Sequence, residues 1–310
     1  MKLRVLLASS SNLALPLLRE LERDPRIELL GVLSTPDKPK GRHGTPSPNE
    51  LGLSLQSLGV PLWKPVTESE LEGLIRSIAP DLVIVIAYGK LIKRSLIDSV
   101  PRGWINLHFS NLPSYRGAAP VQRALLHGEK DFGYSFFQID EEMDTGPVYL
   151  QGGFMPEETS PATEILDELA ARGASSLPEV ISMILTGEKP VKQRGEYSLA
   201  PKISKEELRL ESGIGVEGML RQIRAFTRKP GVWFELSGRR CIITSARRSG
   251  EIRASASISF IEGRALVGCG DGSIEILRIK PEGKSEMSGA DWLRGLHLSP
   301  GEFRTMDPVL

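Results

Sequence analysis

The chain has 310 residues, 40% hydrophobic and 25% charged, a composition typical of a globular protein long enough for two domains. Its 39 Lys and Arg balance 39 Asp and Glu, but unevenly: residues 1–185 carry 18 basic and 23 acidic side chains, and the rest carry 21 and 16. A basic C-terminal part favours a polyanionic partner, although ordinary solvated surface charge explains the same count.

Cysteine usage and the apolar runs exclude several classes of protein. Cys241 and Cys269 are far apart and form no CxxC pair, which argues against a zinc site or a disulfide framework. The strongest apolar run, Leu82 to Ala87, is far shorter than a membrane span. The apolar stretch that starts at Leu3 is too short for a signal peptide. We therefore expect a cytoplasmic enzyme with no membrane partner.

Short apolar runs alternate with amphipathic segments over the first 185 residues. The runs predict strands at Arg4–Ala8, Ile27–Leu33, Leu82–Ala87 and around Trp104–Leu107. Helices are expected after Asn12 and near Leu71–Ile78, Leu91–Ile97 and Ala162–Leu185. This alternation predicts an α/β domain with a doubly wound, mainly parallel sheet. Such a sheet binds ligands at the carboxyl ends of its strands.

The C-terminal third has a different pattern. Residues 187–204 lack periodicity and read as a linker, so we expect a catalytic domain at 1–186 and a second domain at 205–310. After a helix near Glu217–Arg228 come the short runs Trp233–Leu236, Cys241–Ala246, Ala265–Val267 and Ile274–Leu277. Asp271-Gly272 is a hairpin turn signal between two of them. These features predict a small β-barrel of the oligonucleotide-binding type.

Residues 35–48 form an unusually long connection without an apolar anchor. The segment contains Lys38, Lys40, Arg42 and His43 and a single acid, Asp37. Long loops inside compact domains are usually functional or disordered. A basic loop suits phosphate capture, and an ordinary surface loop is the alternative.

Asn106 and His108 carry the strongest chemical signal. They lie two residues apart at the end of a predicted strand, so their side chains project from one face at the ligand-binding edge of the sheet. A carboxamide beside an imidazole suits stabilisation of a developing oxyanion. A histidine in this position is more often structural, but a carboxylate from Asp144 would orient its ring and favour catalysis.

Other enzyme classes lack their motifs. Asp144-Thr145-Gly146 matches the aspartic-protease triplet, but that chemistry needs two such carboxylates and the chain has one triplet. The chain has no GxSxG sequence, which argues against a serine hydrolase. Ser9-Ser10-Ser11 follows the first strand in place of GxGxxG, which argues against a nicotinamide dehydrogenase.

Taken together, the motifs resemble those of the 10-formyltetrahydrofolate-dependent formyltransferases. The resemblance is carried by Asn106-Leu107-His108, Ser110 to Pro113, Arg116 to Pro120, Asp144-Thr145-Gly146, Thr35 to Pro39 with Gly41-Arg42, Val85 to Gly89, Ile203 to Glu207, Ile223 to Phe226 and Gly270 to Ser288. The Asn-His-Asp core alone indicates the superfamily. The basic loop and the C-terminal motifs resemble the branch that formylates a tRNA-bound methionine.

The resemblance implies roles for particular residues. The catalytic set would be Asn106, His108 and Asp144. The folate site would comprise Ile86, Ala87, Tyr88, Ser110, Asn111, Leu112 and Pro113. The acceptor end of tRNA would be held by Lys38, Lys40 and Arg42. In the linker, we expect Lys192, Arg194 and Lys202 to contact tRNA phosphates without selecting sequence.

The implied reaction uses 10-formyltetrahydrofolate as formyl donor and the amino group of an initiator methionyl-tRNA as acceptor. Attack of the free amine would create a tetrahedral oxyanion that Asn106 and His108 stabilise, assisted by Asp144. No metal is implied, and we expect a monomer. The chain departs from the family pattern at Ser9–Ser11, Phe109, Asn111 and Pro48-Asn49-Glu50.

Two alternatives share part of this evidence. A formyltransferase for an amino-sugar or nucleotide amine, or a formyl-folate hydrolase, would have the same catalytic core but would not need a basic barrel. A catalytically silent RNA-binding protein would keep the barrel but would not need the Asn106, His108 and Asp144 set.

Overall fold

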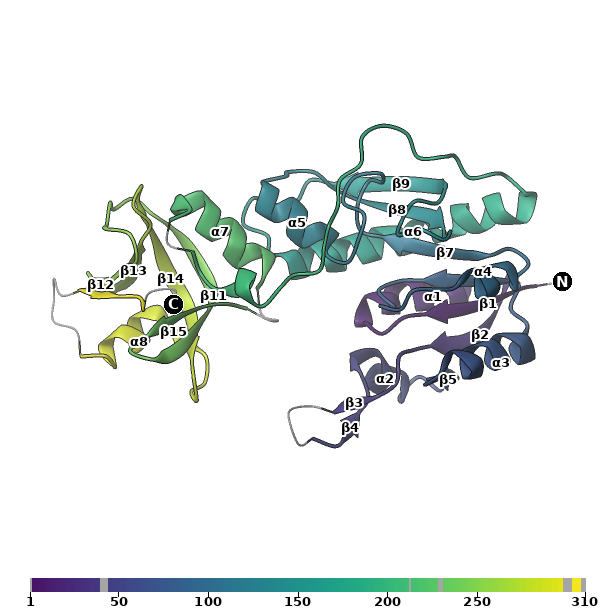
Figure 1. Ribbon diagram of the computed structural model, residues 1–310, viewed down its shortest axis with the longest axis horizontal. Helices are drawn as coiled ribbons and strands as arrows, with labels where there is room; N and C mark the ends of the chain where they lie inside the picture. The colour runs from purple at the N-terminus through teal and green to yellow at the C-terminus, as the bar shows by residue number, and fades with distance from the viewer. Residues whose placement is uncertain (1, 40–43, 212, 228–230, 298–302, 308–310) are drawn as a thin grey trace. The chain divides into compact units, whose positions relative to one another are not determined.

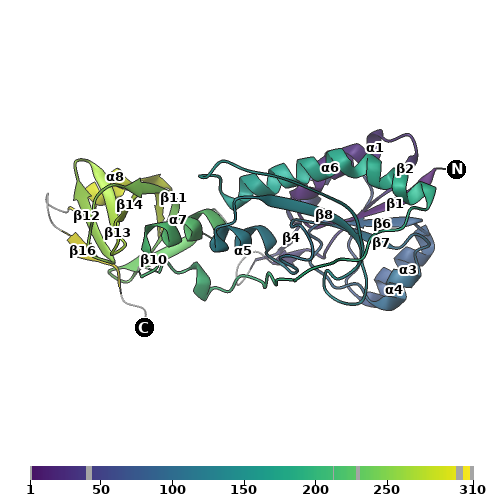
Figure 2. The ribbon, with the colours of Figure 1, turned by 90° about the horizontal axis from the view of Figure 1, so that it is seen from above.

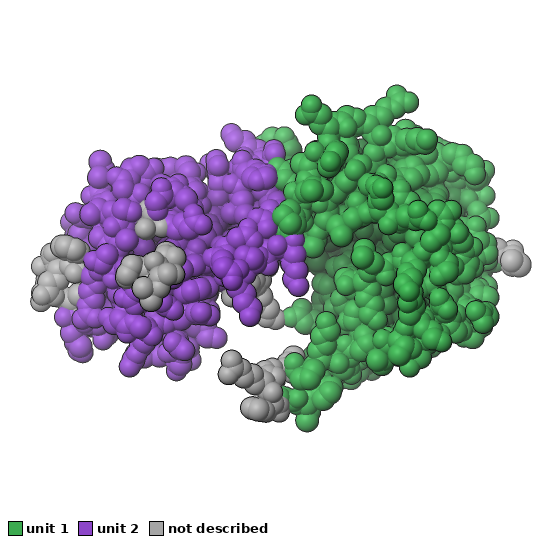
Figure 3. Space-filling view, in the orientation of Figure 1, with its two compact units in different colours: residues 1–120, 131–155, 166–201 green, residues 121–130, 156–165, 202–310 purple. Residues whose placement is uncertain are grey.

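The computed structural model describes residues 2–39, 44–211, 213–227, 231–297 and 303–307. The chain forms two compact units (Figure 3). Unit 1 takes in residues 1–120, 131–155 and 166–201, and unit 2 takes in residues 121–130, 156–165 and 202–310. The predicted domain boundaries at 186 and 205 stay a prediction.

Unit 1 is built on a seven-stranded sheet in the order β5-β2-β1-β6-β7-β8-β9 (Figure 1). Its strands are β1 (Leu3–Ala8), β2 (Ile27–Leu33), β5 (Leu62–Trp63), β6 (Leu82–Val85), β7 (Trp104–His108), β8 (Phe132–Gln138) and β9 (Val148–Phe154). The first five of the sheet order run parallel, and β8 and β9 are antiparallel additions. The predicted fold class is confirmed.

Helices cover both faces of this sheet (Figure 2). The helical elements of unit 1 are η1 (Asn12–Ala14), α1 (Leu15–Arg23), α2 (Glu50–Leu55), α3 (Glu68–Ile78), α4 (Arg94–Asp98) and, from residue 166 onward, α6 (Ala162–Thr186). Helices α1 and α6 lie on one face, and α3 and α4 lie on the other (Figure 2). On the α3–α4 side the fully buried Trp104 donates its indole N–H to the Leu96 carbonyl at 3.0 Å.

Two predicted elements were too long. The strand after Leu82 ends at Val85, and the helix begins at Arg94 instead of Leu91. Leu91 is 81% exposed, so its side chain does not contribute to a helical core face. Residues 86–93 are therefore a loop that follows the carboxyl end of β6, where a parallel sheet binds its ligands.

The basic connection at residues 35–48 contains a short hairpin. Strands β3 (Lys38–Pro39) and β4 (Pro46–Ser47) pair antiparallel, and residues 40–43, including Lys40, Arg42 and His43, lie outside the described residues. At its base, Lys64 forms an ion pair with Asp37 at 2.5 Å. Pairing of backbone with backbone needs no apolar side chain, which is why a segment without an apolar anchor still forms regular structure.

Unit 2 contains a nearly closed antiparallel barrel. Its strands are β10 (Val232–Leu236), β11 (Arg239–Ser249), β12 (Ser257–Ile261), β13 (Arg264–Gly268), β14 (Ser273–Pro281), β15 (Met287–Ser288) and β16 (Phe303–Thr305). They follow the order β10-β11-β14-β13-β12-β16, with β15 beside β14. Two residues beyond β16, Asp307 donates its backbone N–H to the Glu235 carbonyl of β10 at 2.8 Å, which brings the first and last strands together.

The remaining described elements of unit 2 are α5 (Pro120–His127, from residue 121 onward), η2 (Glu206–Leu208), α7 (Gly215–Ala225) and α8 (Gly289–Arg294). The predicted barrel is therefore confirmed, with a helix that starts two residues before the predicted Glu217; Arg228 lies outside the described residues. Cys241 and Cys269 are free and buried, and burial raises the pKa of each thiol to about 11. None of the described helices is long and apolar enough to cross a membrane.

A glycine makes the close packing of the sheet edge possible. The pairing of β1 with β2 shifts register between Val5 and Leu6, and Gly31 stands at this irregularity with φ +143°. A Cβ atom at Gly31 would lie 2.5 Å from the Pro61 carbonyl oxygen and from the Trp63 ring. Both the backbone conformation and the neighbouring strand therefore require glycine here.

We predict opposite effects for two glycine-to-alanine changes. Gly31→Ala should lower the free energy of unfolding by about 1–3 kcal/mol, because the methyl group overpacks the edge. Gly73→Ala should raise it by about 0.5–1 kcal/mol, because Gly73 lies in α3 with open space around its missing Cβ. Urea unfolding followed by circular dichroism compares the two. Equal midpoints for both variants would contradict the packing described for Gly31.

Candidate active site

A cavity of about 560 Å³ lies at the carboxyl ends of β6 and β7, within unit 1. Strand β7 brings Asn106 and His108 to it from one face, as their spacing predicted. The turn that follows β8 closes the cavity with Asp144, and Val85, Leu107, Phe137 and Ile139 supply apolar wall. The three predicted catalytic side chains thus meet at one cavity.

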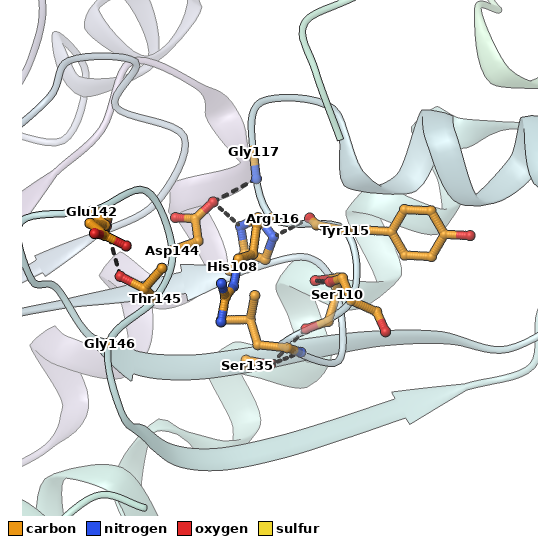
Figure 4. Close-up of polar contacts among 12 residues, drawn as sticks. His108, Ser110, Tyr115, Arg116, Gly117, Ser135, Glu142, Asp144, Thr145 and Gly146 are labelled. Carbon is orange, nitrogen blue, oxygen red and sulfur yellow. Dashed lines mark hydrogen bonds and ion pairs between the residues drawn. The ribbon is translucent and has the colours of Figure 1, made fainter. Parts of the chain in front are cut away.

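The ring of His108 is held at both nitrogens. Its Nε2 lies 2.9 Å from the Tyr115 carbonyl oxygen, and its Nδ1 lies 3.6 Å from Oδ2 of Asp144 (Figure 4). The edge of the ring packs against Phe137 with 6.3 Å between centroids. The side chain is only 6% exposed, so these contacts leave it little freedom to rotate.

The hydrogen bond to Tyr115 determines which ring nitrogen of His108 carries the proton when the ring is neutral. A carbonyl oxygen can only accept, so Nε2 of His108 carries the proton in that bond. Nδ1 then faces the carboxylate of Asp144 and is protonated only when the ring is charged. The site thus places an imidazole nitrogen beside a carboxylate, two kinds of group that general acid–base catalysis uses.

Asp144 is held by its own backbone conformation and by a hydrogen bond from the backbone of Gly117. Its residue adopts the left-handed conformation, with φ +56°, and its carboxylate accepts a hydrogen bond from the Gly117 backbone N–H at 2.7 Å (Figure 4). The side chain is 14% exposed. Non-glycine residues in this conformation cluster at functional sites, where the surrounding structure determines them.

Two residues that line the cavity have a buried polar atom without a hydrogen-bond partner in the part of the chain that the structure describes: Oδ1 of Asn106, and the hydroxyl of Tyr88, whose side chain packs in the core cluster that contains Trp104. Burial raises the pKa of Tyr88 to about 12, so its hydroxyl stays neutral and can donate. Because buried polar groups are nearly always satisfied, these atoms indicate where a polar ligand would bind.

The segment predicted to surround the folate after β6 divides into two roles. Ala87 and Tyr88 line the cavity, whereas Ile86 is fully buried and does not. Ala87 has φ +48°, and its carbonyl accepts a hydrogen bond from the Ser10 hydroxyl at 2.9 Å. The serine run after β1, which departs from the family pattern, therefore fixes this part of the wall.

The second predicted folate segment, Ser110 to Pro113, does not line the cavity. Ser135 holds it: its hydroxyl donates to the Ser110 carbonyl at 2.6 Å and accepts from the Leu112 N–H at 3.1 Å. Gln151 donates to the Leu112 carbonyl at 2.9 Å, and Asn111 is exposed. Contact of this segment with folate stays a prediction.

The residues predicted to bind tRNA lie on the surface where the structure describes them. Lys38, Lys192, Arg194 and Lys202 are exposed, whereas Lys40 and Arg42 belong to the undescribed residues 40–43. Within the described ranges, no group of three or more His, Cys, Asp and Glu side chains is arranged to hold a metal ion.

The sequence did not predict the residues that connect the two loops beside His108. Gln193 donates to the carbonyls of Asp144 and Gly146, both at 2.8 Å, and Arg116 donates to Gln193. The Arg116 guanidinium also lies over the Tyr197 ring. Since Gln193 and Tyr197 fall in an aperiodic stretch, no sequence signal marked them.

Known proteins match both parts of the chain. Residues 1–181 match the family model described as formyl transferase, and residues 202–297 match that of the formyl transferase C-terminal domain. A methionyl-tRNA formyltransferase from Cutibacterium acnes is 36% identical over 312 residues, covering 96% of this chain and 99% of that protein. One from Thermus thermophilus is 40% identical over 296 residues, covering 93% and 94%.

A solved structure has the same fold. HypX from Aquifex aeolicus, crystallised in complex with tetrahydrofolic acid, superimposes with a TM-score of 0.69 at 19% identity. The match covers 94% of this chain and 47% of the HypX chain, so this chain spans about half the length of that protein. With a family model matched over more than half of its length, and relatives 36% and 40% identical over almost all of it, this chain belongs to the formyl transferase family.

Proposed function

We propose that this chain transfers the formyl group of 10-formyltetrahydrofolate to the amino group of an initiator methionyl-tRNA, as a cytoplasmic monomer. The observation that carries the proposal is the convergence of Asn106, His108 and Asp144 at one cavity in a chain of this family. Relatives named methionyl-tRNA formyltransferase match both of its parts, which favours a tRNA substrate over a small amine.

The cavity suits a reduced folate. A flat ring system with polar edges needs apolar walls and a few polar groups that fix its orientation. Phe137, Ile139 and Val85 provide walls of that kind, and the hydroxyl of Tyr88, which has no partner among the described residues, would provide a polar group. When bound, the folate would supply a formyl group on a nitrogen that can leave.

The proposed mechanism needs no covalent bond to the protein. The amine nitrogen bonds to the formyl carbon, the bond from that carbon to the folate nitrogen breaks, and one proton passes from the amine to the leaving nitrogen. Asn106 donates a hydrogen bond from its amide to the formyl oxygen as negative charge develops there. The Nδ1 of His108, held beside Asp144, receives and returns the proton.

Substitution of the catalytic residues should reduce turnover strongly. Asn106→Ala and His108→Ala should each lower kcat on the order of 10²–10³-fold, as loss of one oxyanion donor or of the proton carrier does. Following labelled formyl from formyl-folate into charged initiator tRNA measures this. The exposed His127 on α5 offers a matched control, His127→Ala, which should keep full activity. Near-normal turnover in both Asn106→Ala and His108→Ala would contradict the catalytic roles proposed for these residues.

Removing the Tyr88 hydroxyl should separate folate binding from stability. In the Tyr88→Phe variant, a buried hydroxyl that has no partner within the described ranges disappears, so the free energy of unfolding should stay equal or rise by up to about 1 kcal/mol. If the hydroxyl bonds the folate, the KM for folate should rise roughly 2–10-fold. Steady-state kinetics and urea unfolding measure the two effects. An unchanged KM for folate would exclude this contact.

The two groups of basic residues should behave differently in tRNA binding. Replacing Lys192, Arg194 or Lys202 by alanine should weaken binding evenly across tRNAs. Each lost phosphate contact should also flatten the dependence of binding on salt by roughly one unit. Arg42→Ala should instead reduce turnover, because a misplaced acceptor end moves the amine away from the formyl carbon.

Binding measured over a salt series and single-turnover kinetics test this contrast. The linker substitutions should weaken the binding of initiator and elongator tRNAs by the same factor. Were Arg42→Ala to leave both turnover and affinity for tRNA unchanged, the basic loop would be ordinary surface. A formyltransferase acting on an amino-sugar or nucleotide amine would then be the better proposal.

A further inference from the structure

The stretch predicted as a linker is attached along its length to the active site. Residues 191–200, here named the active-site strap, lie within unit 1. At one end Val191 pairs with Val148, each N–H donating to the other's carbonyl at 2.8 Å. At the other end Leu199 bridges to Arg116, and Ala200 donates to the Arg116 carbonyl at 2.6 Å. The strap therefore spans from the first residue of β9 to the loop after β7.

Gln193 uses every group of its carboxamide in this span. Its amide nitrogen donates to the carbonyl oxygens of Asp144 and Gly146, both at 2.8 Å. Its oxygen accepts from the Arg116 guanidinium at 2.6 and 3.2 Å. A carboxamide has two donors and an acceptor, so one side chain satisfies a loop on each side of His108.

The strap bonds to the two left-handed residues that hold His108. Asp144 has φ +56° and Tyr115 has φ +58°, a conformation that non-glycine residues keep only where their surroundings impose it. Gln193 fixes the carbonyl of Asp144, and the Ser198 hydroxyl accepts the N–H of Tyr115 at 2.8 Å. These two residues present the carboxylate and the carbonyl that face the two ring nitrogens (Figure 4).

We propose that Gln193 is a positioning residue for formyl transfer, acting through Asp144 on the Nδ1 side of His108 and not by touching substrate. This inference rests on the proposed function. Its neighbours Lys192 and Arg194 are exposed, whereas Gln193 is partly buried against the loops. The cationic side chains of Lys192 and Arg194 are thus exposed to solvent on either side of Gln193, the residue that positions Asp144.

Three variants test the proposal. Gln193→Met keeps the length of the side chain without its hydrogen bonds, and Gln193→Glu keeps an acceptor for Arg116 but loses both donors to the 144–146 loop. Both should lower kcat on the order of 10–100-fold, because a small displacement of a catalytic group has effects of that size. The KM for methionyl-tRNA should stay within about twofold, since no substrate contact is lost. Glu196→Gln, at an exposed position of the same strap, should match the wild type.

A second readout does not depend on activity. The ¹⁵N resonances of the His108 ring report the carboxylate beside Nδ1, so they should move in Gln193→Met and stay in place in Glu196→Gln. If the wild type does not formylate methionyl-tRNA, the proposed function fails, and the resonances still decide whether Gln193 positions the pair.

Either of two outcomes would overturn the inference. One is a Gln193→Met variant with unchanged kcat and unchanged His108 resonances. The other is a raised KM for tRNA with kcat intact, which would make Gln193 a tRNA contact. Urea unfolding of Gln193→Met and Gln193→Glu identifies loss of folded protein. In that case, kcat is calculated from the concentration of folded protein, and only the resonances of the folded protein are compared.

Discussion

The contact on which the site depends is that of the His108 ring with the Tyr115 carbonyl on one side and the Asp144 carboxylate on the other. The carbonyl and the carboxylate each act on one nitrogen of the ring. The carbonyl requires a proton on Nε2, and this leaves Nδ1 as the only ring nitrogen that can exchange one. The carboxylate of Asp144 is the charged group that faces Nδ1. A ring free to rotate would lose this distinction between its nitrogens, which is why burial matters as much as charge.

The parallel sheet supplies half of this arrangement and the loops supply the rest. Strand β7 fixes where Asn106 and His108 project, because alternation along a strand is rigid. Tyr115 and Asp144 belong to loops, and both adopt left-handed conformations. Such backbone must be held by its neighbours, and here the Gly117 N–H, Gln193 and Ser198 do so. The geometry of the proposed catalytic pair therefore depends on a stretch of chain that carries none of the proposed catalytic groups.

Most of the fold and the side chains from β7 could be predicted from the sequence, since hydrophobic periodicity and strand alternation are local properties. The sequence did not predict strands β8 and β9, because β8 pairs with β7, and β9 with β8, through contacts that local periodicity does not report. The meeting of Asp144 with His108 likewise needed the tertiary structure. Gln193 left no signal at all: its donors bind backbone carbonyls, which every residue has, so nothing in the partner sequence marks the contact.

Ion pairs within unit 2 affect how strongly its basic residues can attract a tRNA. The C-terminal part has a surplus of basic residues, but several arginines of the barrel form ion pairs with its own acids. These pairs include Arg247–Glu275, Arg248–Glu217, Arg253–Glu251, Arg264–Glu251 and Arg278–Glu286. A paired guanidinium contributes less to the potential felt by a phosphate than its formal charge implies, because the neighbouring carboxylate offsets it. Over residues 205–310 the surplus is only three, with 17 basic and 14 acidic side chains. Exposed cations such as Lys192 and Arg194, on the strap that positions Asp144, then carry a larger share of the proposed binding than their number would indicate.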